Sequence, residues 1–196
     1  MKSSQLIIIE SLTLDDEAHD RFEGHIIANI LKLGGIKTTY FYIRTKRELK
    51  NIIKRISKDE STPKYLHISC HGLSNGIQLT FDQVNIQELP EILSPLKSNK
   101  RAFFSACEVV NMDTAKILLN KNNSCISILG PSGSPEFDRA AIFWSSFYHI
   151  VMKSQNTTMG NYAIKRISKQ LSTLYTIPIA IFIKRKDGSI GCEKFK

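Results

Sequence analysis

Short apolar runs alternate along this chain with longer segments in which apolar residues recur at helical spacing. The short runs, bounded by turn-forming residues, predict buried strands, and the longer segments predict amphipathic helices. Strands are expected at residues 6–10, 36–43, 65–70, 102–106, 125–129 and 177–184. Because strands and helices alternate, the pattern favours an α/β fold, a three-layer α/β/α sandwich around a mostly parallel six-stranded sheet.

Helices are expected over residues 15–33, 45–56, 89–96, 113–118, 139–152 and 157–174. The apolar side chains that share one face of the first helix are Phe22, Ile26, Ile30 and Leu33. The side chains expected to point inward from the last helix are Tyr162, Ile167, Leu171 and Leu174. Asn75-Gly76 predicts a hairpin within residues 72–81, and Asp113 is expected to cap its helix. Residues 184–196 are expected to form a basic tail.

Length and hydropathy restrict the class of protein further. The chain has 196 residues, enough for one sizeable core but few for two, so a single domain over residues 1–196 is expected. No apolar run approaches the roughly 18 residues that cross a bilayer, so no membrane association is expected. The apolar run at residues 6–10 is short for a signal peptide, and no small-residue cleavage site follows it. These features predict a cytoplasmic protein.

The formal net charge is +9, from 27 basic and 18 acidic residues. Such an excess is compatible with nucleic-acid binding. The lysines, however, are scattered through helices and the C-terminal tail, without interleaved aromatic residues. A solvated basic surface is therefore the favoured interpretation, and a nucleic-acid partner is not expected. The four cysteines lack the dense spacing of a disulfide scaffold and are expected to be reduced thiols.

Two of the expected strands end in a reactive side chain. The strand at residues 65–70 is followed by His71 and Gly72, and the strand at residues 102–106 is followed by Cys107. In an open α/β sheet, ligands bind just outside the carboxyl ends of the strands. A histidine takes the proton of a thiol nucleophile and later returns it to a leaving amine. The pattern therefore predicts a cysteine peptidase with His71 and Cys107 as its catalytic pair.

Other interpretations of these residues stay open. Free cysteines are often simply buried in the core, and a histidine at a strand end often bonds a local carbonyl. A metal site would need His67, Cys70, His71 and Cys107 together. Alternation along the strand, however, places Cys70 opposite His67, and no Cys-x-x-Cys pair is present. Neither a metal nor an organic cofactor is expected.

At this point the residues resemble a known family. His67-Ile68-Ser69-Cys70-His71-Gly72 and Phe104-Ser105-Ala106-Cys107-Glu108 are similar to the two catalytic signatures of the caspase-like (clan CD) cysteine peptidases, most of all to their CHAT branch. The order of histidine and cysteine and their separation of 36 residues (107 − 71) suit that family. The resemblance covers residues 65–148 well, and implies a caspase-like sandwich. Where the family often carries an LWPVDD pattern, this chain has residues 130–136 instead, without the tryptophan.

The resemblance implies a covalent mechanism. Cys107 attacks the peptide carbonyl, His71 acts as base and then as acid, and a thioester is hydrolysed by water. Gly72 offers an unobstructed amide, which together with the Cys107 amide is expected to bind the oxyanion. The resemblance also places an acidic residue at Asp138, beside Glu136, which would favour a basic residue before the scissile bond. Capping of the following helix is the alternative role of Asp138, and Asp82 is a weaker candidate for the pocket.

The same resemblance suggests what surrounds the enzyme. Bacterial relatives of this kind often belong to defence or regulated-cell-death systems, where they cut a partner such as a pore-forming effector protein. A protein substrate and an activating partner protein are therefore expected. The alternative function, from a different class, is a catalytically inactive caspase-like fold that serves as a binding or scaffold module.

Overall fold

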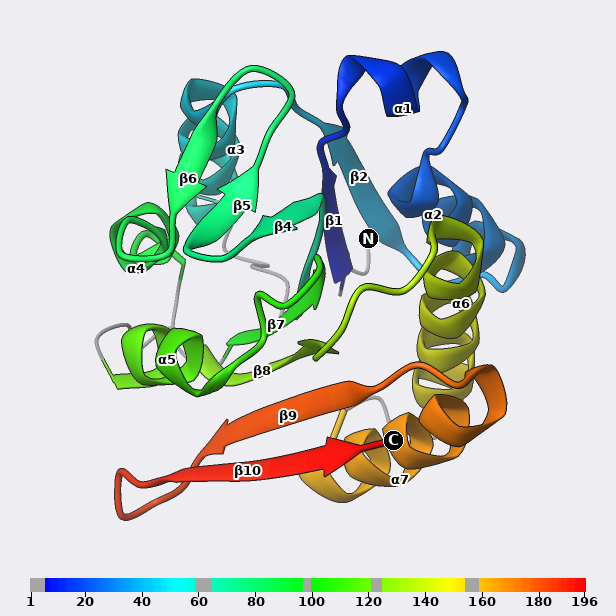
Figure 1. The fold of residues 1–196 in the computed structure, drawn as a ribbon, viewed down its shortest axis with the longest axis vertical. Helices are drawn as coiled ribbons and strands as arrows, with labels where there is room; N and C mark the ends of the chain where they lie inside the picture. Colours follow the sequence, from blue (N-terminus) through cyan, green and yellow to red (C-terminus); the bar gives the residue numbers. More distant parts are fainter. Residues whose placement is uncertain (1–5, 59–64, 97–99, 121–124, 154–158) are drawn as a thin grey trace.

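A seven-stranded sheet forms the centre of the protein, in the order β10-β9-β8-β7-β3-β1-β2 (Figure 1). The computed structural model describes residues 6–58, 65–96, 100–120, 125–153 and 159–196. The strands of this sheet are β1 (Leu6–Glu10), β2 (Thr38–Tyr42), β3 (Tyr65–Ser69), β7 (Lys100–Ser105), β8 (Cys125–Pro131), β9 (Ile179–Lys184) and β10 (Ile190–Phe195).

Five strands of this sheet are parallel to one another, as the alternating pattern predicts: β1, β2, β3, β7 and β8. β9 runs antiparallel to β8, and β10 runs antiparallel to β9. The expected count of six strands is wrong because part of the predicted tail forms β10. A turn with Gly188 at a φ of 82° reverses the chain, and Arg185 donates its amide to the Ser189 carbonyl at 2.8 Å. β10 is an edge strand and only partly buried, so its sequence is too polar to show the apolar run that predicts a buried strand.

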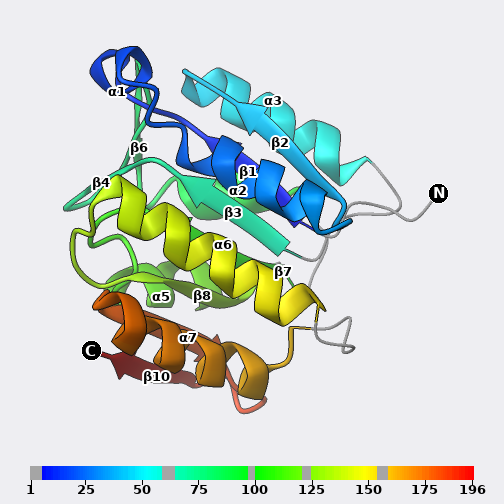
Figure 2. The same ribbon diagram turned by 90° about the vertical axis from the view of Figure 1, so that its right-hand side faces the viewer.

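Helices cover both faces of the sheet, which confirms the three-layer sandwich (Figures 1 and 2). They are α1 (Leu14–Ala18), α2 (Glu23–Leu33), α3 (Lys46–Ser57), α4 (Leu89–Leu93), α5 (Met112–Ala115) with the π-helix η1 (Lys116–Asn120), α6 (Phe137–Lys153) and α7 (Asn161–Tyr175). One hydrophobic core lies between the sheet and α3, α4, α5 and η1. The second lies between the sheet and α2, α6 and α7.

The expected helix over residues 15–33 is two helices, α1 and α2, separated by a turn in which Asp20 has a φ of 53°. The apolar face expected for it is also wrong, since the Ile26 side chain is 46% and Leu33 90% exposed. The buried face of α2 instead carries Gly24, Ile27, Ala28 and Leu31. Gly24 lies on this face, and a Cβ added there would come within 3.0 Å of Ile8. Close packing on β1, rather than the bulkiest apolar stripe, decides the orientation of α2.

Predicted details of α7 and α5 also differ from the structure. In α7 the predicted inward residues Tyr162 and Leu174 are exposed, whereas Ile167 and Leu171 are buried as predicted. The start of that helix was predicted at residue 157, which lies outside the described residues, and the helix itself begins at Asn161. Asn111, not Asp113, caps α5, because its side chain accepts the Thr114 amide proton at 2.9 Å.

A small antiparallel sheet follows β3 and carries His71. Its strands are β4 (His71–Leu73), β5 (Gly76–Gln78) and β6 (Gln83–Asn85), so the hairpin predicted at Asn75-Gly76 is confirmed and a third strand joins it. Thr80 anchors this sheet to the segment after β1 by donating its hydroxyl to the Leu12 carbonyl at 2.6 Å. Asp82 accepts the amide proton of Lys46, the first residue of α3, at 2.6 Å, beside the capping box that Thr45 and Glu48 form.

Among the described residues, no helix is long and apolar enough to cross a membrane. The four cysteines are free thiols, and only Cys192 is exposed.

Candidate active site

The carboxyl ends of β3 and β7 bring His71 and Cys107 together. These strands are parallel neighbours with Ser69 opposite Ser105, and the pairing extends to the Cys70 amide, which donates to the Ser105 carbonyl at 3.1 Å. The residues that follow therefore leave the sheet side by side. His71 and Cys107 line one cavity of about 170 Å³.

Gly72 lies directly against the Cys107 backbone. A Cβ added at Gly72 would stand 1.8 Å from the Cys107 carbonyl oxygen, so no other residue fits there without displacing the backbone. The residue after the cysteine, Glu108, has a φ of 59°, a left-handed conformation that costs a non-glycine residue about 1–2 kcal/mol. Asn111 stabilises this turn by donating its side-chain amide to the Glu108 carbonyl at 3.0 Å.

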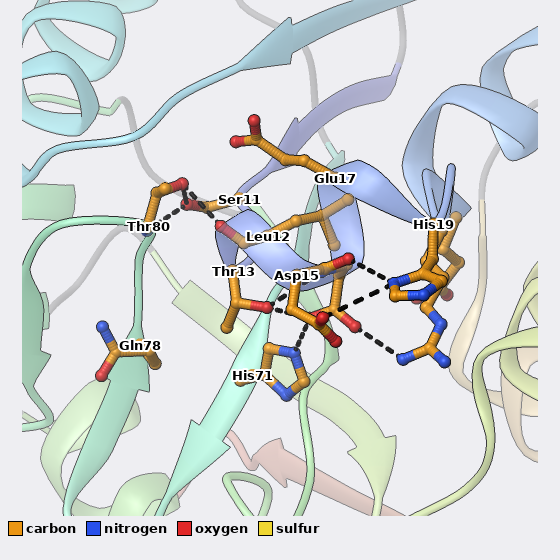
Figure 3. Close-up of polar contacts among 12 residues, drawn as sticks. Ser11, Leu12, Thr13, Asp15, Glu17, His19, His71, Gln78 and Thr80 are labelled. Atoms are coloured by element: carbon orange, nitrogen blue, oxygen red, sulfur yellow. Dashed lines mark hydrogen bonds and ion pairs between the residues drawn. The ribbon is translucent and has the colours of Figure 1, made fainter.

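A third polar residue at this edge is Asp16 of α1. Its Oδ2 lies 2.6 Å from His71 Nε2, although the two residues are 55 positions apart in the chain. The His71 ring points towards the segment that carries Thr13 and Asp15 (Figure 3). Thr13 donates its hydroxyl to Asp16 Oδ2, and Arg21 donates Nη1 to Oδ1 at 2.9 Å. The sequence analysis missed Asp16, although Thr-x-x-Asp is a helix-start signature that marks the turn.

The Asp16 carboxylate is 5% exposed and ionised. Burial by itself raises the pKa of an aspartate, but here the hydrogen bonds from Thr13, His71 and Arg21 outweigh it and lower the pKa of Asp16 to about 2. A fixed negative charge therefore faces His71 over the whole working pH range.

Glu23, the first residue of α2, is a second carboxyl that the sequence analysis missed. It is 4% exposed and lines the cavity with Cys107. Ser105 donates its hydroxyl to Oε1 at 2.6 Å, and Ser69 donates to Oε2 at 2.9 Å. Burial raises the pKa of Glu23 to about 8, in spite of these hydrogen bonds, and the nearby Glu10 adds to the rise. Glu23 is therefore mostly protonated at neutral pH.

The predicted pocket acids lie beside this cavity rather than in it. Glu136 and Asp138 line a neighbouring cavity of about 510 Å³, and they are not among the residues that line the cavity with Cys107. Glu23 and Phe137 line both cavities. Asp138 lies in the first turn of α6, where its carboxylate accepts the Arg139 amide proton at 2.7 Å.

Phe137 contacts His71 from the side of α6. Its ring lies edge-on to the His71 ring, with 5.5 Å between the ring centroids. The guanidinium carbon of Arg21, which also binds Asp16, lies 5.7 Å from the Phe137 centroid. His71 is thus held between a carboxylate and an aromatic ring.

The four residues of the alternative metal site are not all grouped. His67 is buried in the aromatic core, where its Nδ1 lies 2.8 Å from the Tyr148 hydroxyl and burial lowers its pKa to about 3. Cys70 lines the cavity with His71 and Cys107, but it is buried, and burial raises the pKa of its thiol. Within the described ranges, no three His, Cys, Asp or Glu side chains are grouped to hold a metal ion.

Two solved structures share this architecture at low sequence identity. One is a secreted C11 cysteine protease from Bacteroides thetaiotaomicron, in complex with an irreversible peptide inhibitor. It has a TM-score of 0.58 and 10% identity, over 92% of this chain and 66% of that one. The other is caspase-1 from Spodoptera frugiperda, with a TM-score of 0.56 and 15% identity over 88% and 78% of the two chains.

At identities this low, the structural similarity shows the fold alone, which is the caspase-like fold of these cysteine proteases. The chain spans about two thirds of the length of the C11 protease. No protein-family model and no curated protein matches the sequence.

Proposed function

We propose that this protein is a cysteine endopeptidase in which Cys107 is the nucleophile and His71 is its base. The observation that carries the proposal is that both side chains line one cavity at the carboxyl edge of β3 and β7, in a caspase-like fold. The motif Ser105-Ala106-Cys107-Glu108 further supports the CHAT branch of that class.

The proposed reaction has two stages. His71 takes the Cys107 proton, the thiolate forms a C–S bond with the peptide carbonyl carbon, and the negative charge moves to the carbonyl oxygen. The Gly72 and Cys107 amides hold that oxyanion, and His71 then gives its proton to the leaving amine as the C–N bond breaks. In the second stage His71 takes a proton from water, the hydroxide attacks the thioester, and the C–S bond breaks to release the carboxylic acid and the thiol.

We further propose cleavage after a basic residue, with Glu23 as the recognising acid. The cavity beside Cys107 has apolar walls, which include Ala106, Pro131 and Ala140, and a buried carboxyl among them. An ammonium or guanidinium group entering it would displace the Glu23 proton to solvent and form an ion pair. Glu136 and Asp138, in the neighbouring cavity, would add negative potential along the approach.

The wider context is proposed on the resemblance alone. We propose a cytoplasmic enzyme of a bacterial antiviral defence system that cuts a protein substrate, such as a pore-forming effector, after activation by a partner protein.

The test compares new protein N-termini in cells that express the wild type or Cys107→Ala. Cys192→Ala is the matched control, because this cysteine is exposed and lies on the edge strand β10. We expect new N-termini that follow Lys or Arg with the wild type and the control, and none with Cys107→Ala. Identical N-termini in all three samples would instead support the scaffold function.

A further inference from the structure

We propose that Asp16 is a positioning residue that holds the proton of His71 on Nε2 and leaves Nδ1 as the nitrogen that serves Cys107. This inference rests on the proposed peptidase function. It adds a third residue to the pair and assigns a role to each ring nitrogen.

The geometry of the contact carries the inference. His71 Nε2 and Asp16 Oδ2 are 2.6 Å apart, within the range of a charge-assisted hydrogen bond. Since an ionised carboxylate only accepts hydrogen bonds, the ring nitrogen that faces it must carry the proton. The neutral ring then has its lone pair on Nδ1, the nitrogen that is left to accept a proton.

The carboxylate is itself held in place. Its Oδ1 accepts from Arg21 at 2.9 Å and its Oδ2 accepts from the Thr13 hydroxyl, so that both oxygens are fixed before His71 is considered. The opposite side of the His71 ring contacts the edge of Phe137. This arrangement restricts both the rotation and the tautomer of the imidazole.

A capping role does not account for the contact. Thr13 is the residue that caps α1, because its side chain accepts the Asp16 amide proton at 3.2 Å, and this bond needs no carboxylate. α1 has five residues, and Asp15 and Glu17 also supply negative charge to its first turn. The carboxylate of Asp16, which is 5% exposed, instead faces the imidazole of His71, the proposed general base, which lies on β4.

The kinetic test compares Asp16→Asn with Asp15→Asn. Asp15 is the neighbouring acid on α1, but its side chain is 77% exposed and does not touch His71. For Asp16→Asn we expect kcat to fall on the order of 10- to 100-fold, because the base is misoriented, with KM within about twofold of the wild type. For Asp15→Asn we expect wild-type kcat and KM. Equal kcat values in the two variants would overturn the proposal.

The second readout does not depend on turnover. The ¹⁵N chemical shifts of the His71 ring, measured at pH 9 in the inactive Cys107→Ala protein, identify the nitrogen that carries the proton. We expect it on Nε2, and a mixture of tautomers once Asp16→Ala is added. A proton on Nδ1 in the Cys107→Ala protein overturns the proposal, even where the Asp16 variants fail to fold.

The two readouts separate the proposals. A wild-type protein that cleaves no substrate, but carries the His71 proton on Nε2, contradicts the peptidase function and leaves the pairing of Asp16 with His71 intact. An active wild type with the proton on Nδ1 contradicts the role of Asp16 alone.

Discussion

Replacing Glu23 with glutamine should make the protein more stable at neutral and alkaline pH. The pKa of Glu23 is about 8 in the folded protein and has an ordinary value of 4.5. Below pH 4.5 both states hold the proton and the group costs nothing. Between pH 4.5 and 8 only the unfolded state loses it, so stability falls by about 1.36 kcal/mol per pH unit. The cost at pH 7 is then roughly 3 kcal/mol, and above pH 8 it reaches about 5 kcal/mol.

Glutamine has the same shape as glutamate, accepts one serine hydroxyl and does not titrate, so the free energy of unfolding of Glu23→Gln should lack this slope. Urea unfolding of both proteins at pH 5, 7 and 9 measures the difference, in which the contributions of groups that do not interact with Glu23 cancel. We expect the free energy of unfolding of Glu23→Gln to rise relative to that of the wild type as the pH rises. If Glu23 binds a basic side chain of the substrate, the same variant should lose cleavage after Lys and Arg. A stability difference that is the same at pH 5 and pH 9 would show that Glu23 is not a proton-holding buried acid.

Three further predictions concern Cys107 and the residues around it. Gly72→Ala should lower the free energy of unfolding by at least about 3 kcal/mol, because its Cβ would overlap the Cys107 carbonyl, whereas Gly160→Ala, with open space around it, should change it by less than about 0.5 kcal/mol by urea titration. Glu108→Gly should raise stability by about 1 kcal/mol in the same assay, because glycine relieves the left-handed backbone; a loss would contradict that strain. A peptide that carries a thiol-reactive electrophile should modify Cys107 well before Cys70, because Cys70 is buried and the pKa of its thiol is raised. Mass spectrometry of tryptic fragments measures the labelling of each cysteine, and equal labelling would count against an activated nucleophile.

Much of the fold was predictable because buried parallel strands consist of continuous apolar runs. These runs predicted six of the seven strands of the central sheet and placed His71 and Cys107 at the ends of neighbouring strands. β10 was not predictable from the same signal, since an edge strand buries only part of its surface and tolerates lysines. The orientation of α2 was missed because large apolar residues lie on both its buried and its exposed side, and because Gly24, which lets the helix approach β1, carries almost no hydrophobic signal.

The parts of the site that the sequence did not reveal are held by contacts between distant segments. Asp16 faces a histidine 55 positions away, and Glu23 accepts hydrogen bonds from serines on two strands. In the sequence both acids look like ordinary first-turn residues of a helix, where a negative charge is favourable in any protein. Only the loop geometry after β1 decides that they turn inward.

The pairing of β3 with β7 also joins two halves of the chain. Asp16, Glu23 and His71 all precede α4, whereas Cys107 follows β7. A single break between β6 and α4 would leave the base and its supporting acids on one fragment and the nucleophile on the other. Each fragment would be inert by itself, and the two would regain a complete site only by reassembling across the β3–β7 pairing and the contact between α2 and α6.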